Sequence, residues 1–443
     1  MKKNVPANYR PISLLSIFDK ILEKLMYNRI VHFFSLRKVF FKYQFGFRKH
    51  HSTSLALVEL LDNLYTKLDE REIVAGIYLD LQKAFDTVDH YILLNKIYKY
   101  GIRGKVWDWF KSYLTNRKQF VAIGDINSVT EVLYCGVPQG SILGPLLFLI
   151  YVNDIKNCVT DCDVKLFADD TNVFVSGKSV HNVINQSNLI LSSLSDWLVC
   201  NKLSISIDKT CYSLFGTNRK CCDCSCPLVI NSATVREVNS TKYLGVIIDS
   251  SLAWSDHIDY IFNKLLKFVG IFYKLSFKLS PEILKQLYFA FIHPYISYGI
   301  EIYANACYSH LNKLILLNNK ILRIIQRMKM TTPVRILYSN YNCLPIPLLH
   351  DYQLLLLVHK CMFHQNLLPE VFHDYFVCNS LVHSHSTRSS HNLHLYSIRS
   401  GFGSRCVKFK ASQLWNELPA DVRNIQSFNC FKFKLRKYLS SLC

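Results

Sequence analysis

The 443-residue sequence predicts an α+β fold, because apolar strand segments are mixed with amphipathic helices up to about residue 256 and only helical segments follow. Hydrophobic residues make up 50% of the chain and charged residues 19%, a composition that provides ample core and argues against disorder. The length indicates roughly two to four compact units. Lysine and arginine total 52 against 32 acids, so the net charge of +20 favours a polyanionic partner, nucleic acid before anionic membrane.

Membrane and secretion signals are not visible in the sequence. The apolar runs 146–152 and 354–358 are far shorter than the roughly 20 residues that a spanning helix needs, so we expect no membrane partner. Residues 1–6 turn polar at once and do not have the character of a signal peptide. The 16 cysteines are scattered, several of them within apolar segments, which indicates reduced thiols and an intracellular protein.

Helical periodicity marks most of the expected helices in the first 250 residues. These helices span residues 17–34, 52–68, 86–100, 106–114, 141–155 and 183–200. We expect Gly101 to end the third of them, because glycine adopts the left-handed conformation that commonly follows a helix. A glycine-containing loop at residues 44–48 lies between the first two helices.

Apolar and alternating segments mark the strands. The first expected strand covers residues 73–79 and has Asp80 at its end. The others cover residues 119–123, 129–135, 164–167, 173–175, 204–207, 211–215 and 243–248. The first is apolar almost throughout, which is typical of a strand that is covered on both faces. The second and third form a hairpin around residues 124–127. The last three complete a mixed sheet.

After about residue 256 the sequence indicates helices. Ser280-Pro281-Glu282 is a typical helix start, with a capping serine, a proline at the first helical position and an acid near the positive end of the helix. A long helix over residues 310–328 would carry three cations at spacings of three and four, hence on one face. A solvated helix face is the simpler interpretation for any one of these cations. The chain ends with an aromatic and basic run at residues 428–438.

Two clusters of metal-type side chains are not expected to bind zinc. The four cysteines within residues 221–226 stand closer together than the usual zinc-binding pairs and lack a second pair at a useful spacing, so an unstructured loop is favoured. The four histidines within residues 383–394 lack cysteine partners, and their serine-rich surroundings favour a polar linker.

Two adjacent acids, Asp169 and Asp170, lie between the apolar strands 164–167 and 173–175, which predicts a tight hairpin with both acids at its tip. Adjacent carboxylates repel one another and are costly to desolvate, so cations would stabilise them. Hard divalent ions such as Mg²⁺ bind one or two carboxylates together with substrate phosphates. Taken alone, an Asp-Asp pair is more often a solvated turn.

A partner for these acids is available in Asp80, which ends the apolar strand 73–79. Two-metal phosphoryl transfer needs carboxylates from separate elements that converge on ions roughly 4 Å apart. Such a meeting requires tertiary folding, and the simpler interpretation is that Asp80 merely begins a turn. Between the acidic segments lies the turn 136–141, whose glycines and proline would bring backbone and a glutamine amide close to a flat ligand.

A series of motifs follows in a specific order along the chain. They are Asn8-Tyr9-Arg10-Pro11-Ile12-Ser13, Gln44-Phe45-Gly46-Phe47-Arg48, Tyr78-Leu79-Asp80 with Phe85-Asp86, Gly136-Val137-Pro138-Gln139-Gly140-Ser141, Phe167-Ala168-Asp169-Asp170, Asn201-Lys202-Leu203 with Lys209-Thr210, and Tyr243-Leu244-Gly245. In this order they resemble the reverse transcriptases of non-LTR (LINE-type) retrotransposons, nearest to the jockey-like group. The resemblance covers residues 8–250 and continues more loosely through residues 294–298 and 414–419.

The resemblance implies a two-metal polymerase site. Asp80 and Asp169 match the catalytic metal ligands, with Asp170 as the third acid, and the implied cofactor is a pair of Mg²⁺ ions. Lys209 matches the candidate proton donor to pyrophosphate, although a surface lysine at a strand end is common.

Other motif residues match positions around the substrates. Phe85 matches the residue that blocks a ribose 2′-hydroxyl and so favours deoxynucleotides. Gln139 and Gly140 match the turn that supports the incoming nucleotide and the template. Arg48 matches a fingers residue that grips the triphosphate, for which a planar guanidinium is well suited.

The remaining matched residues concern the primer and the template. Tyr243, Leu244 and Gly245 match a hairpin that holds the primer end, although their apolar character equally fits a core. In this setting Lys320, Arg323 and Arg327 would contact template–primer phosphates independently of sequence.

The implied architecture is a right-hand polymerase, with fingers and palm in residues 1–250, a helical thumb in 251–340 and a helical C-terminal region of unassigned function in 341–443. The implied activity is extension of a DNA primer on an RNA template with deoxynucleoside triphosphates, in the nucleus. The motifs begin at Asn8, so we expect a truncated element without the usual preceding endonuclease. An inactive nucleic-acid-binding relic and a group II intron-type or telomerase-like polymerase are the alternative interpretations.

Overall fold

The computed structural model describes residues 12–216, 227–382 and 389–442. The described chain forms two compact units. The first contains residues 12–49, 75–212 and 227–237, and the second contains residues 50–74, 213–216, 238–382 and 389–442. Motif residues 8–11, the four clustered cysteines and the first two of the four histidines lie outside the described residues. The predicted domain boundaries at residues 250 and 340 stay predictions.

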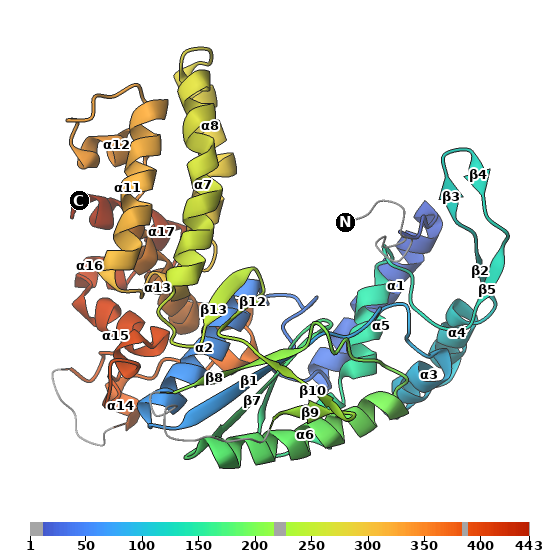
Figure 1. Cartoon of the computed structure of the whole chain (residues 1–443). Coiled ribbons are helices and arrows are strands. Elements are labelled where there is room, and N and C mark those ends of the chain that lie inside the picture. Colours follow the sequence, from blue (N-terminus) through green and yellow to red (C-terminus); the bar gives the residue numbers. More distant parts are fainter. Residues whose placement is uncertain (1–11, 217–226, 383–388, 443) are drawn as a thin grey trace. The chain divides into compact units, whose positions relative to one another are not determined.

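A five-stranded mixed sheet, most of whose residues belong to the first unit, organises the fold (Figure 1). Its order is β11-β8-β1-β7-β6, with β1 at Ile73–Leu79, β6 at Asp163–Phe167, β7 at Asp170–Gly177, β8 at Cys211–Phe215 and β11 at Arg236–Glu237. Every residue of β1 is buried, which confirms the prediction of a strand covered on both faces. β6 and β7 are antiparallel, whereas β11 and β8 are parallel.

Short strands accompany this sheet in the first unit. They are β2 (Arg117–Gln119), β3 (Ala122–Ile123), β4 (Ile126–Asn127), β5 (Glu131–Leu133), β9 (Val229–Ile230) and β10 (Ala233–Thr234). β2 pairs with β5 and β3 with β4, which confirms the predicted hairpin around residues 124–127.

The helices of the first unit share one apolar cluster. They are α1 (Ile17–Leu36), α3 (His90–Lys99), α4 (Lys105–Leu114), α5 (Leu143–Val152) and α6 (Val180–Cys200), with a 3₁₀ turn at Ile155–Cys158. α5 is apolar along its whole length, and side chains of α1, α3, α4 and α6 belong to the same buried cluster. Each large apolar side chain buried there contributes about 2 kcal/mol. The position of α5, and of the turn that precedes it, is therefore well determined.

The second unit is dominated by helices (Figure 1). They are α2 (Thr53–Asp69), α7 (Ser255–Ser276), α8 (Pro281–Phe291), α9 (His293–Ser297), α10 (Ile300–Tyr303), α11 (Tyr308–Ile325), α12 (Val334–Tyr341), α13 (Ile346–Phe363), α14 (Asn379–Val382), α15 (Val407–Glu417), α16 (Ala420–Arg423) and α17 (Phe428–Ser441), with a hairpin of β12 (Ser240–Tyr243) and β13 (Val246–Asp249) and 3₁₀ turns at Gln365–Leu367, Glu370–Phe372 and Gly403–Arg405. Ser280 caps α8 by accepting the Ile283 N–H, as predicted. No helix in the described parts of the chain is both long and apolar enough to cross a membrane.

Two predicted strands differ from the structure. Residues 204–207 form no strand, because the segment makes only a single bridge, between Ile205 and Leu81. The predicted strand 243–248 is instead a hairpin and a separate two-stranded sheet. Its direction reverses at Leu244 and Gly245, whose φ values of 44° and 83° are incompatible with a continuous strand.

Several predicted helices have different ends: α5 and α6 differ by two or three residues at one or both ends from the predicted ranges 141–155 and 183–200, and two further cases have a clear cause. The helix expected from residue 86 begins at His90, because the Asp89 side chain accepts the Ile92 N–H at 2.9 Å and caps the helix there. The helix expected over residues 310–328 ends at Ile325. Arg327 has a φ of 53°, so the α-helical backbone cannot continue through it.

A buried carboxylate, Asp62 of α2, links distant parts of the second unit. Its side chain accepts hydrogen bonds from the backbone N–H groups of Val407 at 2.6 Å and Lys408 at 2.8 Å, and from the Tyr375 hydroxyl. The two N–H groups open α15, so Asp62 caps a helix that is remote in sequence. Burial raises the pKa of Asp62 from 3.8 to about 6. The hydrogen bonds to Asp62 lower the pKa, most strongly the bond from Tyr375, but burial has the larger effect.

We predict that Asp62→Asn changes the pH dependence of stability. The folded-state pKa lies above the unfolded one, so the stability that Asp62 contributes is fully present below about pH 4 and is lost as the pH rises through about 6. The loss amounts to about 3 kcal/mol, and an amide cannot undergo it. The thermal midpoint of the variant should therefore rise relative to wild type between pH 4.5 and pH 7.5. The exposed Glu70 provides the control Glu70→Gln; a midpoint difference for Asp62→Asn that does not change with pH would contradict the prediction.

Candidate active site

Asp169 lies in the two-residue turn between β6 and β7. Phe167 pairs with Asp170 across the hairpin, which leaves Ala168 and Asp169 as the turn. The predicted hairpin is confirmed, but Asp170 opens β7 and is not a turn residue. Ala168 has a φ of 57°, a left-handed conformation that costs a non-glycine residue about 1–2 kcal/mol. Asp169 is half-buried and Asp170 is exposed.

The side chain of Gln44 holds this turn. Gln44 is only 2% exposed, and its Oε1 accepts the backbone N–H of Ala168 at 2.9 Å and that of Gly46 at 2.8 Å. The Phe45 N–H donates to the Leu166 carbonyl at 2.8 Å, so the loop also runs along the edge strand β6. We call this set of contacts the Gln44 clamp. It satisfies the N–H of a strained residue and so stabilises the turn conformation.

Gly46 permits the close approach of this loop to the turn. A Cβ built at Gly46 would lie 2.3 Å from the Ala168 nitrogen, so no other residue fits without a shift of the backbone. The next residue, Phe47, directs its ring at Phe85, with the two ring centroids 6.2 Å apart and nearly perpendicular. One short loop therefore contacts both the acidic turn and the segment that follows β1.

Asp80 follows β1, and β1 is hydrogen-bonded to β7, which begins at Asp170. The Asp80 backbone is held on both sides, since its carbonyl accepts the Ser206 N–H at 2.8 Å and its N–H lies 3.4 Å from Thr210 Oγ1. Lys209 Nζ lies 3.1 Å from Asp80 Oδ2, and 72% of the Lys209 side chain is exposed. An ion pair this exposed contributes less than about 1 kcal/mol, so another cation can readily replace the lysine.

Phe85 is held between two aromatic rings. The centroids of the Phe85 and Phe148 rings lie 4.6 Å apart, and Phe148 belongs to α5. The second neighbouring ring is that of Phe47. Phe85 remains half-buried, so part of its ring faces solvent. The ring is thus both fixed in place and partly accessible.

The turn before α5 is fastened to the same segment. The Val137 N–H donates to the Phe85 carbonyl at 2.8 Å, and Gln139 Nε2 donates to Asp86 Oδ1 at 2.8 Å. Gly136 has a φ of 87°, and a Cβ there would lie 2.9 Å from the Asp86 carbonyl oxygen. The motif around Gln139 is therefore packed directly against the motif that contains Phe85.

Glu23 of α1 is a site-supporting residue that the sequence analysis missed. It is 1% exposed; its Oε2 accepts the Ile142 N–H at 2.6 Å and its Oε1 accepts the Tyr113 hydroxyl at 2.6 Å. A carboxylate at a helix N-terminus is stabilised by the helix dipole, so Glu23 anchors the start of α5. Gln139 and Gly140 immediately precede this point.

The sequence contains one signal that could have revealed Glu23. The buried residues of α1 are Glu23, Ile30 and Phe34, at spacings of seven and four. Glu23 therefore lies on the buried face of the helix, where an unpaired charge would be costly. An acid at such a position indicates a buried partner, but it does not say which partner.

Arg48 contacts its own loop. Its Nη1 donates to the carbonyls of Phe41 at 3.0 Å and Gln44 at 3.3 Å, and its guanidinium carbon lies 5.1 Å from the centroid of the Phe40 ring. These contacts stiffen the loop that carries Gln44. The predicted contact of Arg48 with a triphosphate stays a prediction.

The three acids offer oxygen donors of the kind that hard divalent cations prefer. Within the described residues, no three His, Cys, Asp or Glu side chains are grouped so that they could hold a metal ion by themselves. Mg²⁺ normally retains water or substrate phosphate among its ligands and does not need a closed protein cage. The binding of Mg²⁺ by Asp80, Asp169 and Asp170 stays a prediction.

The predicted primer-contacting residues lie at the β12–β13 turn of the second unit. Tyr243 is 5% exposed and is a core residue, whereas Leu244 and Gly245 form the tip. The Tyr298 hydroxyl donates to the Leu244 carbonyl at 2.5 Å, and a Cβ on Gly245 would lie 3.1 Å from the Tyr298 ring. Residues 294–298, where the resemblance continues more loosely, thus end in the residue that supports this tip.

The three predicted template-contacting cations have different surroundings. Lys320 is exposed on α11. Arg323 donates to a backbone carbonyl at 3.3 Å, and Arg327 donates to the carbonyls of Ser276 at 2.7 Å and Leu279 at 3.1 Å. Arg327 lies beyond the end of α11, so the predicted stripe on one helical face is wrong for this residue. The two arginines serve the fold of the second unit.

Comparison with known proteins gives concordant matches. A family model described as reverse transcriptase (RNA-dependent DNA polymerase) matches residues 1–248. The chain is 32% identical over 329 residues to the RNA-directed DNA polymerase from mobile element jockey of Drosophila melanogaster, and equally to that of Drosophila funebris. Each match covers 72% of this chain and 35% of the relative, so the chain spans about a third of the length of these curated relatives.

Among solved structures, telomerase from Candida albicans in complex with a fragment of telomeric RNA matches with a TM-score of 0.39 and 13% identity, over 73% of this chain and 54% of that one. The family match is the decisive result, because it covers more than half of the chain and includes every motif of the first unit. The predicted resemblance is confirmed: the chain belongs to the reverse transcriptase (RNA-dependent DNA polymerase) family.

Proposed function

We propose that this chain is an RNA-directed DNA polymerase that extends a DNA primer on an RNA template. The Gln44 clamp carries the proposal, because it joins one family motif to the acidic turn and, through Phe47, to Phe85. The names of the jockey relatives and the net charge of +20 support a nucleic-acid substrate. As the resemblance to retrotransposon enzymes implies, we propose that the protein acts in the nucleus.

In this proposal Asp80, Asp169 and Asp170 hold two Mg²⁺ ions. When bound, the ions lower the pKa of the primer 3′-hydroxyl and neutralise the triphosphate and the leaving pyrophosphate. The chain contributes the placement of the carboxylates, which depends on a buried strand for Asp80 and on the Gln44 clamp for Asp169. Lys209, next to Asp80 and largely exposed, is the candidate proton donor to pyrophosphate.

The nucleotide would lie against Phe85 and the turn at Gln139 and Gly140. The partly exposed Phe85 ring is fixed by its neighbours and would leave no room for a 2′-hydroxyl. Gly140 is exposed with a φ of 104°, which lets its backbone approach a flat ligand. Arg48 would bind the triphosphate by exchanging its carbonyl partners for phosphate oxygens, which are stronger acceptors.

Primer and template contacts are proposed for residues of the second unit. The tip at Leu244 and Gly245, with Tyr243 beneath it, would support the primer end. Lys320, with its exposed position, would contact template–primer phosphates directly, whereas Arg323 and Arg327 would support the same surface. We propose residues 1–250 as fingers and palm and residues 251–340 as thumb.

The first test is primer extension by the full chain on poly-A with oligo-dT and Mg²⁺. Asp169→Asn combined with Asp170→Asn should reduce extension by at least about 10²-fold, because the charge that stabilises the transition state is lost. The control Asp163→Asn, at the other end of β6, should retain activity. Extension that survives the double substitution would refute the site. A wild-type chain that binds template–primer without extending it would favour the inactive relic.

The second test addresses the Gln44 clamp. In Gly46→Ala the new Cβ would lie 2.3 Å from the Ala168 nitrogen, so the acidic turn must move. A displacement of about 1 Å costs roughly 10²-fold in rate, and we expect kcat to fall by that factor while the KM for nucleotide changes little. Gly270→Ala, where a Cβ meets no atom within 4 Å, is the matched control. Equal kcat values for the two variants would show that the clamp does not position Asp169.

The third test concerns sugar selectivity. Phe85→Ala should lower the ratio of kcat/KM for deoxynucleotides over ribonucleotides by at least about tenfold, because space opens beside the 2′ position. Phe277→Ala, which removes an exposed ring of the second unit that packs on Tyr273, serves as the control. Rates with both nucleotide classes should be measured in the same extension assay. An unchanged ratio in Phe85→Ala would exclude this residue as the determinant of sugar choice.

A further inference from the structure

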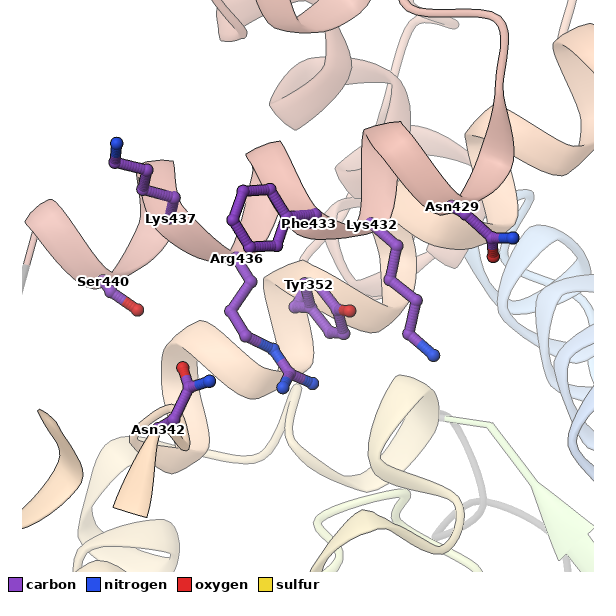
Figure 2. A pocket seen from close by; sticks show the side chains of 8 residues that line it. All are labelled: Asn342, Tyr352, Asn429, Lys432, Phe433, Arg436, Lys437 and Ser440. Atoms are coloured by element: carbon purple, nitrogen blue, oxygen red, sulfur yellow. The ribbon is translucent and has the colours of Figure 1, made fainter. Parts of the chain in front are cut away.

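The C-terminal helix α17 presents a basic side to a groove in the second unit. α17 carries Lys432, Lys434, Arg436 and Lys437 and contains no acid. A cavity of about 420 Å³ is lined by one side of this helix, including three of these cations, together with Asn342 beyond α12 and Tyr352 of α13. Figure 2 shows Lys432 and Arg436 pointing from α17 toward the helix that carries Tyr352.

The helix that carries these cations is firmly held. Phe431, Leu435 and Leu439, on its opposite side, are each less than 5% exposed, and α17 packs on α13. Arg436 is also placed, because its guanidinium carbon lies 5.4 Å from the centroid of the Tyr352 ring. Tyr352 itself is only 2% exposed. The helix backbone and Arg436 are therefore held in place, whereas the side chains of Lys432, Phe433 and Lys437 are exposed to a ligand.

The positive charge of this groove is not compensated by acids. No acid lines the cavity, and none of the ion pairs found within the described residues involves Lys432, Arg436 or Lys437. The charge also affects neighbouring residues. The pKa of Lys360 is lowered, mainly by burial and secondly by the charge of Lys432. The pKa of His293 is lowered in the same way, mainly by burial and secondly by the charge of Arg436. Uncompensated cations that line a groove favour an anionic ligand.

An aromatic ring lies among these cations. Phe433 lines the same cavity and is 73% exposed, although a ring of this size is usually buried. Exposed aromatic rings between cations are the arrangement by which proteins bind single-stranded nucleic acid, since bases stack on the ring while phosphates meet the charges. An anionic membrane would instead require a broad exposed apolar face beside the charges.

We propose that this groove binds single-stranded RNA, with Lys432, Arg436 and Lys437 contacting phosphates and Phe433 stacking on a base. Residues 432 and 436 stand one helical turn apart, which allows them to contact separate phosphates. The amide of Asn342 offers a further donor and acceptor at the edge of the groove. The choice of RNA rests on the proposed function, and the site consists of second-unit residues other than those proposed for primer and template.

The test compares RNA binding by full-length variants. A short fluorescein-labelled oligouridylate is titrated with protein at several salt concentrations, and anisotropy gives the affinity. Replacing Lys432, Arg436 and Lys437 by glutamine should make the slope of log affinity against log salt shallower by about 2, because each phosphate contact on a single strand contributes about 0.7. Phe433→Ala should weaken binding by about tenfold without changing the slope.

Controls separate the groove from general charge and from misfolding. Lys434→Gln removes an exposed cation of the same helix that does not line the cavity, and it should leave the slope unchanged. If the triple variant unfolds, the exposed pair Lys432→Gln and Lys437→Gln gives the same test with an expected change of about 1.4 in slope. A groove variant with the wild-type slope overturns the proposal. Loss of binding to phosphatidylserine vesicles with intact RNA binding also overturns it, in favour of a membrane surface.

The outcome is independent of the polymerase assay. The groove variants should extend a preformed short template–primer at saturating concentration, and the variant with Asp169→Asn and Asp170→Asn should keep the groove-dependent RNA binding. Extension without groove-dependent RNA binding would refute this inference alone. Groove-dependent RNA binding by a wild-type chain that cannot extend a primer would refute the proposed function alone.

Discussion

The amide oxygen of Gln44 accepts two backbone N–H groups, one from its own loop and one from the acidic turn 124 residues further along the chain. The second of these N–H groups belongs to Ala168, whose left-handed backbone is strained and whose N–H would otherwise be unpaired. A buried N–H without a partner costs about 1–3 kcal/mol, which is comparable to the cost of the strain itself. The position of Asp169 therefore depends on a side chain from a different motif, and on the absence of a side chain at Gly46.

The other parts of the site are held in the same way, by buried polar groups rather than by surface ion pairs. Glu23 anchors the start of α5, and the turn before α5 is hydrogen-bonded to the segment that contains Phe85 and Asp86. The bonds to the Glu23 and Asp86 carboxylates are charge-assisted and therefore strong, whereas the exposed pair of Asp80 and Lys209 is weak and exchangeable. This division suits the proposed polymerase site, which would need a rigid frame and exchangeable cations.

The second unit shows that a large net charge is not equally available to a ligand everywhere. The side chains of Arg323 and Arg327 donate hydrogen bonds to backbone carbonyls of the same unit. The charge of Asp62 is likewise used within the fold, because this residue caps α15. The groove along α17 differs, because its cations meet neither acids nor carbonyl acceptors among the described residues. Cations that have no acid or carbonyl partner in the described chain, such as those of this groove, are the ones available to a polyanion.

The local pattern of the sequence determined most elements, because hydrophobic periods of two and 3.6 residues are set by neighbours in the chain: β1, α1 and the β6–β7 hairpin occur where predicted. The order of the motifs also determined the family, which the family model confirms. Only the tertiary structure decided that the chain reverses at Leu244, where a Tyr298 hydroxyl supports the turn, that Gln44 holds Asp169, and that Glu23 reaches α5. These outcomes depend on hydrogen bonds between residues far apart in sequence, and no local preference of the chain encodes which distant partner will be present.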